Sequence, residues 1–231
     1  MGTRGAIGFR NSGRDYITYN HFDSYPGYLG NGLLGELAET NIPHLLHIAS
    51  NLILVSDDEG SPKPTDIQVR ECKEYVNLTV ASRDEYSWYC LLRGTQGTLK
   101  PYIAKGLRYM IDSSTFIYDS LWCEYAYIVN LDKNQFEFYK GLQLRLDPTN
   151  RYKVDEPHEV PLLPNEKGND NEEDADSAAI RRRYYPCRLL AAYDLKEICN
   201  AKDVPAMIAR IVADMEQRSE KDSKYNNGDN V

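Results

Sequence analysis

The chain has 231 residues, a formal net charge of −8, and contents of 42% hydrophobic and 27% charged residues. These values suit one globular domain with a well-buried core, and they exclude a wholly disordered or collagen-like chain. Because phosphate backbones and anionic lipid surfaces attract basic proteins, the acidic balance argues against nucleic acid and membranes as partners.

Two short runs rich in β-branched and aromatic residues open the chain. Residues 6–9 and 15–22 are separated by a turn sequence, and they predict an N-terminal β-hairpin. Since side chains alternate between the two faces of a strand, Tyr19, His21 and Asp23 are expected on one face.

Several helices are expected to follow this hairpin. Apolar residues at helical spacing predict them at residues 29–37, 44–52, 66–80 and 98–105. A capping box that runs from Ser82 to Glu85 predicts one more helix, which should end at Gly94.

The strongest β signal lies in the middle of the chain. Residues 121–131 favour a strand on both faces, which is typical of the interior of a sheet. A turn sequence then leads into residues 135–139, where phenylalanines alternate with polar residues. Together these two runs predict a central hairpin.

The C-terminal third predicts a loop, a strand and a helix. A long surface loop has an acidic centre at about residues 165–177 that is expected to be disordered. Residues 184–193 predict a strand, and Pro186 near its start indicates an edge position. A helix is expected at residues 203–218, followed by a flexible polar tail at residues 221–231.

The order of these elements predicts the fold class. Strands that are grouped and joined by hairpins indicate an antiparallel sheet with helices packed on it. The sequence therefore predicts a single α+β domain over residues 1–220.

A glycine motif near the start of the chain resembles a dinucleotide-binding motif, but the residues around it argue against such a site. Residues 30–35 match the pattern G-x-G-x-x-G, and Asp57 follows at about the required spacing. The motif requires a strand that runs directly into the first glycine, but turn residues lie there, and Pro43 interrupts the following helix. A glycine-rich turn is the better interpretation, and no cofactor is predicted.

His21 and Asp23 form the first candidate for chemistry. A carboxylate beside an imidazole can orient it as a general base, or begin a metal site. The alternative is a structural hydrogen bond between the two side chains. A metal site requires further ligands, which the sequence does not supply, so no metal is predicted.

The five cysteines predict a reduced protein. Their number is odd, and no C-x-x-C pair occurs among them. Cys123, in the central strand, could act as a nucleophile beside an imidazole, but a buried and inert thiol is the better interpretation. The chain also lacks the apolar core of a signal peptide, so the expected location is cytoplasmic.

Several motifs resemble those of a family of uncharacterised intracellular proteins in fungi, bacteria and their viruses. These motifs are the opening Met-Gly-Thr-Arg-Gly, the run Tyr-Asn-His-Phe-Asp-Ser-Tyr-Pro at 19–26, and Leu-Trp-Cys-Glu-Tyr-Ala-Tyr at 121–127. The resemblance covers about half of the chain and implies no activity. It implies that a group of residues belongs together, with Glu124 on a neighbouring strand: Arg4, Asn20, His21, Asp23 and Tyr25.

The layout is also similar to that of N-terminal-nucleophile hydrolases, which open with a hairpin at the centre of an antiparallel sheet flanked by helices. Their chemistry requires Cys, Ser or Thr as the first residue of the mature chain. Here removal of the initiator methionine would expose Gly2, and only a further cut would free Thr3. The resemblance therefore implies the architecture alone.

Two functions remain open from the sequence. The first is a binding protein that holds a small ligand or a protein partner near the first hairpin, with Tyr19, Asn20 and Tyr25 as binding residues. The second is a hydrolase or transferase in which His21, oriented by Asp23, acts as general base. In this second hypothesis Arg4 would steady an anionic group and Glu124 would lie nearby. The oligomeric state is left open.

Overall fold

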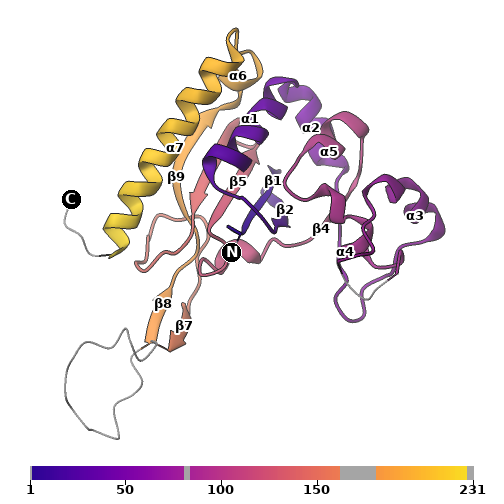
Figure 1. Ribbon diagram of the computed structural model, residues 1–231, viewed down its shortest axis with the longest axis horizontal. Helices are drawn as coiled ribbons and strands as arrows, with labels where there is room; N and C mark the ends of the chain where they lie inside the picture. The colour runs from indigo at the N-terminus through magenta and orange to yellow at the C-terminus, as the bar shows by residue number, and fades with distance from the viewer. Residues whose placement is uncertain (1, 81–83, 162–180, 228–231) are drawn as a thin grey trace, which may run out of the picture.

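The computed structural model describes residues 2–80, 84–161 and 181–227 (Figure 1). The elements around the main sheet are β1 (Gly5–Asn11), β2 (Arg14–Asn20), η1 (Pro26–Gly30), α1 (Asn31–Ala38), α2 (Ile42–Asn51), β5 (Tyr125–Asn130), β6 (Gln135–Lys140), β9 (Arg188–Asp194), α6 (Leu195–Cys199) and α7 (Val204–Asn227). The other elements are β3 (Ile53–Val55), α3 (Asp66–Cys72), η2 (Lys73–Tyr75), α4 (Trp88–Leu91), η3 (Arg93–Thr95), α5 (Lys100–Lys105), β4 (Tyr109–Ile111), η4 (Phe116–Tyr118), β7 (His158–Pro161) and β8 (Arg181–Tyr184).

The α+β fold class is confirmed, but the sheet is mixed rather than purely antiparallel. Its strand order is β2-β1-β5-β6-β9, and both predicted hairpins, β1–β2 and β5–β6, are present. The two hairpins meet through β1 and β5, which run parallel. β2 already ends where β5 begins, since Asn20 and Tyr125 both lie beside Gly5, and the segment with the helices connects these two points at one end of the sheet. Local sequence patterns predict hairpins but not this junction.

Each face of the main sheet carries a different core. Phe9, Tyr127, Phe136 and Phe138 point toward α1, α2 and α7, where leucines and methionines cover them. The opposite face carries a second buried cluster, which includes Ala6, Ala126 and Tyr139, and loops with short turns cover it. Figure 1 shows α7 running along β9 on the helix side. The helices thus cover one face and leave the edges of the sheet free to carry loops.

The C-terminal helix is longer than the sequence predicts. It was expected to end near Arg218, yet α7 continues to Asn227, so residues 221–227 are helical rather than part of a flexible tail. The reason is a buried polar anchor. The Gln143 amide donates to the Asp222 carboxylate (2.7 Å), and Asn226 accepts from the backbone N–H of Leu144 (2.9 Å). Hydrophobic periodicity does not register such polar anchors.

The predicted strand at 184–193 is divided in two. Residues up to Tyr184 pair with β7 in a separate two-stranded sheet, while β9 joins the main sheet as its last strand. The edge position that Pro186 indicated is confirmed. The capping box at Ser82 and the acidic loop at 165–177 lie outside, or partly outside, the described residues.

The helix predicted after the capping box is α4, and another set of groups caps its start. Ser87 accepts from the Cys90 backbone N–H, although the bond is long at 3.5 Å. The Asp57 carboxylate accepts from the backbone N–H groups of Trp88 (2.7 Å) and Tyr89 (2.8 Å). Asp57, the acidic residue of the glycine motif, therefore supports a short helix.

Among the described residues, no helix combines the length and the hydrophobicity that a membrane-spanning segment requires.

Candidate functional site

Three segments meet at one end of the first hairpin. The backbone N–H of Ser24 donates to the Thr3 carbonyl (3.1 Å), and that of Glu124 donates to the Arg4 carbonyl (3.1 Å). The Arg4 backbone N–H in turn donates to the Glu124 carboxylate (3.2 Å). We call this region the rim site; it comprises residues 2–5, 19–25 and 122–124, together with a fourth segment, residues 93–97, whose Gly97 lies close to Asn20. The grouping that the resemblance implied, Arg4 with the end of β2 and with Glu124, is thus present as a backbone arrangement.

Asn20 holds the loop after β2. It is only 6% exposed, and its amide donates to the Phe22 carbonyl (2.5 Å) and to the Ser24 hydroxyl (2.8 Å). The buried Tyr127 hydroxyl donates to the Ser24 carbonyl (2.9 Å) and ties the same loop to the sheet. Asn20 was a candidate ligand-binding residue, but its amide is used in shaping the loop.

Tyr19 and His21 form the polar centre of the rim site. The Tyr19 hydroxyl lies 2.7 Å from His21 Nδ1, and the two rings meet edge-on. The pair arises because alternate residues at the end of β2 share a face. A hydroxyl at Nδ1 fixes the orientation of the imidazole.

Asp23 does not orient His21. The strand ends at Asn20, and Asp23 adopts a left-handed backbone with φ of 50° and an exposed side chain. Within the described ranges no hydrogen bond joins Asp23 to His21. The expectation of a shared strand face was wrong because it extended β2 by three residues. Asp23 instead supplies the turn, a conformation that Asp tolerates better than most residues.

Two guanidinium groups flank this centre. The Arg4 guanidinium stacks on the Trp122 ring at 4.6 Å from its centroid. Arg93, at the start of η3, hydrogen-bonds Gln96 and lies 5.6 Å from the Tyr89 ring centroid. In the described part of the chain neither guanidinium pairs with a carboxylate. An unneutralised pair of this kind is notable in a protein with a net charge of −8.

Sequence patterns did not indicate Arg93. It lies far from the first hairpin in the chain, and the turn around it matches no motif. The structure brings this turn against the end of β2: a Cβ added to Gly97, whose φ is 75°, would lie 3.1 Å from Asn20 Oδ1. The positive φ of Gly97 at this close approach is a local signal of the contact.

The charges and burial at the rim site act on its two titratable groups. Partial burial, Arg93 and Arg4 together lower the pKa of His21 below its ordinary value of 6.5. Burial raises the pKa of Tyr19, and Arg4 opposes that rise. At neutral pH His21 is therefore an uncharged imidazole in a positive local potential.

Exposed aromatic side chains surround the polar centre. Phe22 is 56% exposed and lies edge-on against His21, with ring centroids 4.2 Å apart. Trp122 is 47% exposed beneath Arg4. Tyr25, a candidate binding residue, is 41% exposed and lies at the start of the π-helix η1. Its ring centroid is 6.1 Å from that of Tyr28. Large exposed rings next to arginine are typical of binding surfaces.

Cys123 is a buried thiol. Burial and the neighbouring Cys187 thiol raise its pKa, so the nucleophilic thiolate is disfavoured. Both thiols are fully buried, and the Cys187 thiol donates to the Cys123 carbonyl (3.1 Å). The inert interpretation of Cys123 matches this geometry.

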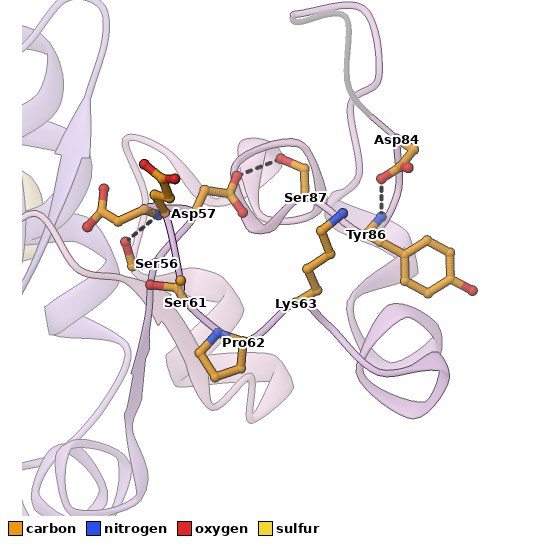
Figure 2. Close-up of a pocket in the computed structure, with 11 residues that line it drawn as sticks. Ser56, Asp57, Ser61, Pro62, Lys63, Asp84, Tyr86 and Ser87 are labelled. Atoms are coloured by element: carbon orange, nitrogen blue, oxygen red, sulfur yellow. Dashed lines mark hydrogen bonds between the residues drawn. The ribbon is translucent and has the colours of Figure 1, made fainter.

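The lining of the pocket in Figure 2 includes none of the predicted site residues. It has a volume of about 360 Å³, and its lining combines residues 56–63 with Asp84, Tyr86 and Ser87. The Asp57 carboxylate accepts from the Ser87 hydroxyl (2.6 Å), as Figure 2 shows. Residues that line this pocket therefore hold the start of α4 in place. The C-terminal end of α4 leads to Arg93.

No family model matches the chain, and neither does any curated protein or solved structure. Among the described residues, no group of three or more His, Cys, Asp or Glu side chains could hold a metal ion. The functional conclusion therefore depends on the geometry of the rim site.

The placement of His21 near two arginines predicts how its pKa responds to substitution and how it contributes to the pH dependence of stability. Replacing Arg93 with Gln removes a positive charge that disfavours the imidazolium, so the pKa of His21 should rise toward 6.5. Because the folded pKa is the lower one, the unfolded chain binds the proton more readily. The stability linked to His21 is thus present above pH 6.5 and is lost as the pH falls through the folded pKa. Imidazole NMR shifts recorded against pH measure this directly; an unchanged or lower pKa in the variant would contradict the assignment.

Proposed function

We propose that this chain is a binding protein and that the rim site holds a small anionic ligand. The observation that carries the proposal is the pair of guanidinium groups at the rim site, Arg4 over Trp122 and Arg93 near Tyr89, which add to the effect of burial in lowering the pKa of His21. Neither has a carboxylate partner within the described residues. An anion bound at the rim site would supply the missing counter-charge, and hydrogen bonds to an ionised group are stronger than those between neutral groups.

The aromatic surroundings suggest a ligand with a flat apolar part beside its charge. Phe22, which contacts His21, and Trp122, which lies beneath Arg4, are both exposed, and rings of this kind stack on planar groups. Tyr19 and His21 supply hydrogen-bonding groups. Phenyl phosphate combines a dianionic group with a ring and is therefore a suitable probe.

The proposal is tested by titration with three probes, followed through amide shifts and Trp122 fluorescence. Phenyl phosphate should bind best, inorganic phosphate more weakly, and benzyl alcohol, which has the ring without the charge, weakest. Replacing Arg4 with Gln should weaken phenyl phosphate binding about tenfold, as expected for the loss of one charge-assisted hydrogen bond.

Arg14 provides a matched control for that variant. It lies at the opposite end of β2, is exposed and stacks on Tyr16 much as Arg4 stacks on Trp122. Replacing Arg14 with Gln removes the same charge and should leave the affinity unchanged. Equal losses in both variants would show a non-specific charge effect, and no saturable binding of any probe would refute the proposal.

One observation favours an enzyme as a second candidate. The 2.7 Å contact from Tyr19 and the lowered pKa of His21 describe an oriented, uncharged imidazole, which a general base requires. In this alternative the hydrolase or transferase would use Tyr19, rather than Asp23, to orient the base. Turnover of phenyl phosphate or phenyl acetate that is lost on replacing His21 with Asn and kept on replacing Asp23 with Ala would support it.

A further inference from the structure

The last strand of the main sheet has a free edge. In the strand order β2-β1-β5-β6-β9, β9 has β6 on one side and, among the residues that the structure describes, no strand on the other. The opposite edge, β2, is partly covered, since its Ile17 carbonyl accepts from the Ser113 backbone N–H (2.8 Å). An unpaired edge presents backbone donors and acceptors to any strand of suitable register.

The hydrogen-bond pattern shows which residue of β9 faces outward. The Leu195 backbone N–H donates to the Asn134 carbonyl (3.0 Å), and bonded pairs recur every second residue in an antiparallel ladder. Tyr193 opposite Phe136 and Ala191 opposite Phe138 are therefore the next bonded pairs. Ala192 lies between them, so its N–H and carbonyl point to the free edge.

The carbonyl of Leu190 also points away from β6. It accepts from Arg218 Nη1 of α7 (3.1 Å), and the ladder is shifted at this point by a bulge. The exposed Ala192 side chain and the 41% exposed Leu189 flank these backbone groups. Within the described ranges the edge therefore offers the Ala192 N–H without a hydrogen-bond partner, and the Leu190 carbonyl bonded to an exposed arginine.

The sequence of β9 is complementary to itself. When Arg-Leu-Leu-Ala-Ala-Tyr-Asp is paired antiparallel to a second copy about Ala191, Arg188 lies opposite Asp194 at both ends. Leu189 then lies opposite Tyr193, and Leu190 opposite Ala192. Opposite charges and aliphatic–aromatic pairs across strands are favourable, and a twofold axis forms each contact twice.

We propose that β9 is a self-association edge, whose partner is the β9 strand of a second copy of this chain. In the dimer the Ala192 N–H of each copy donates to the Leu190 carbonyl of the other, in place of Arg218. Arg218 keeps its contact with Asp214 (2.8 Å) when it releases that carbonyl. The two five-stranded sheets then form one continuous sheet.

The test combines sedimentation with amide hydrogen exchange on the full chain, from micromolar to millimolar protein. The expected result is a monomer–dimer equilibrium in which the Ala192 amide becomes protected as the dimer forms. Replacing Ala192 with Pro removes the outward N–H at an edge position that tolerates proline, and it should raise the dimer dissociation constant about tenfold. Replacing Arg218 with Ala exposes the Leu190 carbonyl and should lower that constant.

Two further variants keep the test decisive. Ala192→Lys leaves the backbone intact and places two like charges close to the twofold axis, so it should also weaken the dimer. Ala209→Lys, at an exposed position of α7, is the matched control and should change nothing. A monomer at every concentration would overturn the proposal. A dimer without protection of Ala192, or protection that does not depend on concentration because another segment covers the edge, would overturn it equally.

Discussion

Replacing Glu137 with Ala is expected to lower the free energy of unfolding by about 3 kcal/mol or more, because removing one partner of a buried ion pair leaves a desolvated charge behind. Glu137 is 1% exposed on the loop-covered face of the sheet. Both of its carboxylate oxygens bind Arg151 (3.1 and 2.8 Å), and Asn130 and Tyr139 complete the set (2.7 and 2.8 Å). Urea denaturation of the variant and the parent measures the loss.

A surface pair provides the control for this prediction. Glu197 and Arg210 are each more than half exposed, so Glu197→Ala should cost less than about 1 kcal/mol. Replacing both Glu137 and Arg151 with leucine should cost less than the sum of the two single replacements, since neither charge is then left alone. Additive losses, or a loss for Glu137 as small as that for Glu197, would show that the pair does not act as a buried unit.

Replacing Gly8 with Ala is expected to destabilise the first hairpin by about 3 kcal/mol, at the upper end of the range for overpacking. A Cβ on Gly8 would lie 2.0 Å from the Tyr16 carbonyl oxygen and 2.8 Å from the Ile17 Cα. Both are backbone atoms, so β1 and β2 must move apart. Thermal unfolding measures the cost, and the Tyr19–His21 pair at the end of β2 should lose its fixed NMR shifts.

Gly32 is the matched control. It lies in α1 with no atom within 4 Å of an added Cβ, and alanine has the higher helix propensity. Gly32→Ala should therefore leave the stability unchanged or raise it by up to about 1 kcal/mol. Equal behaviour of the two alanine variants would contradict the close approach of β1 to β2.

The sequence predicted those features of the fold that depend on residues close together in the chain. Both hairpins, the edge position of β9 and the start of the last helix at Asp203 follow from alternation, turn chemistry and capping. It did not predict that β1 and β5 run parallel, because that pairing joins segments far apart in the chain. The extension of α7 was missed because buried polar anchors, rather than apolar spacing, hold it.

In the candidate site, too, the sequence predicted some of the residues and missed others that only the tertiary fold brings in. Arg4, His21 and Glu124 were expected together, and the chain brings their segments together at the end of the first hairpin. Tyr19 is the partner of His21 because β2 ends before Asp23. Arg93 was missed because only the tertiary fold carries its turn to β2.

The pKa of His21, measured by NMR with and without saturating phenyl phosphate, tests the central claim most directly. A bound anion favours the imidazolium, so the account predicts that phenyl phosphate raises this pKa in the parent protein. In the Arg4→Gln, Arg93→Gln variant the same addition should leave the pKa unchanged. A His21 pKa in the parent protein that does not respond to the anion would contradict a binding site at the end of the first hairpin.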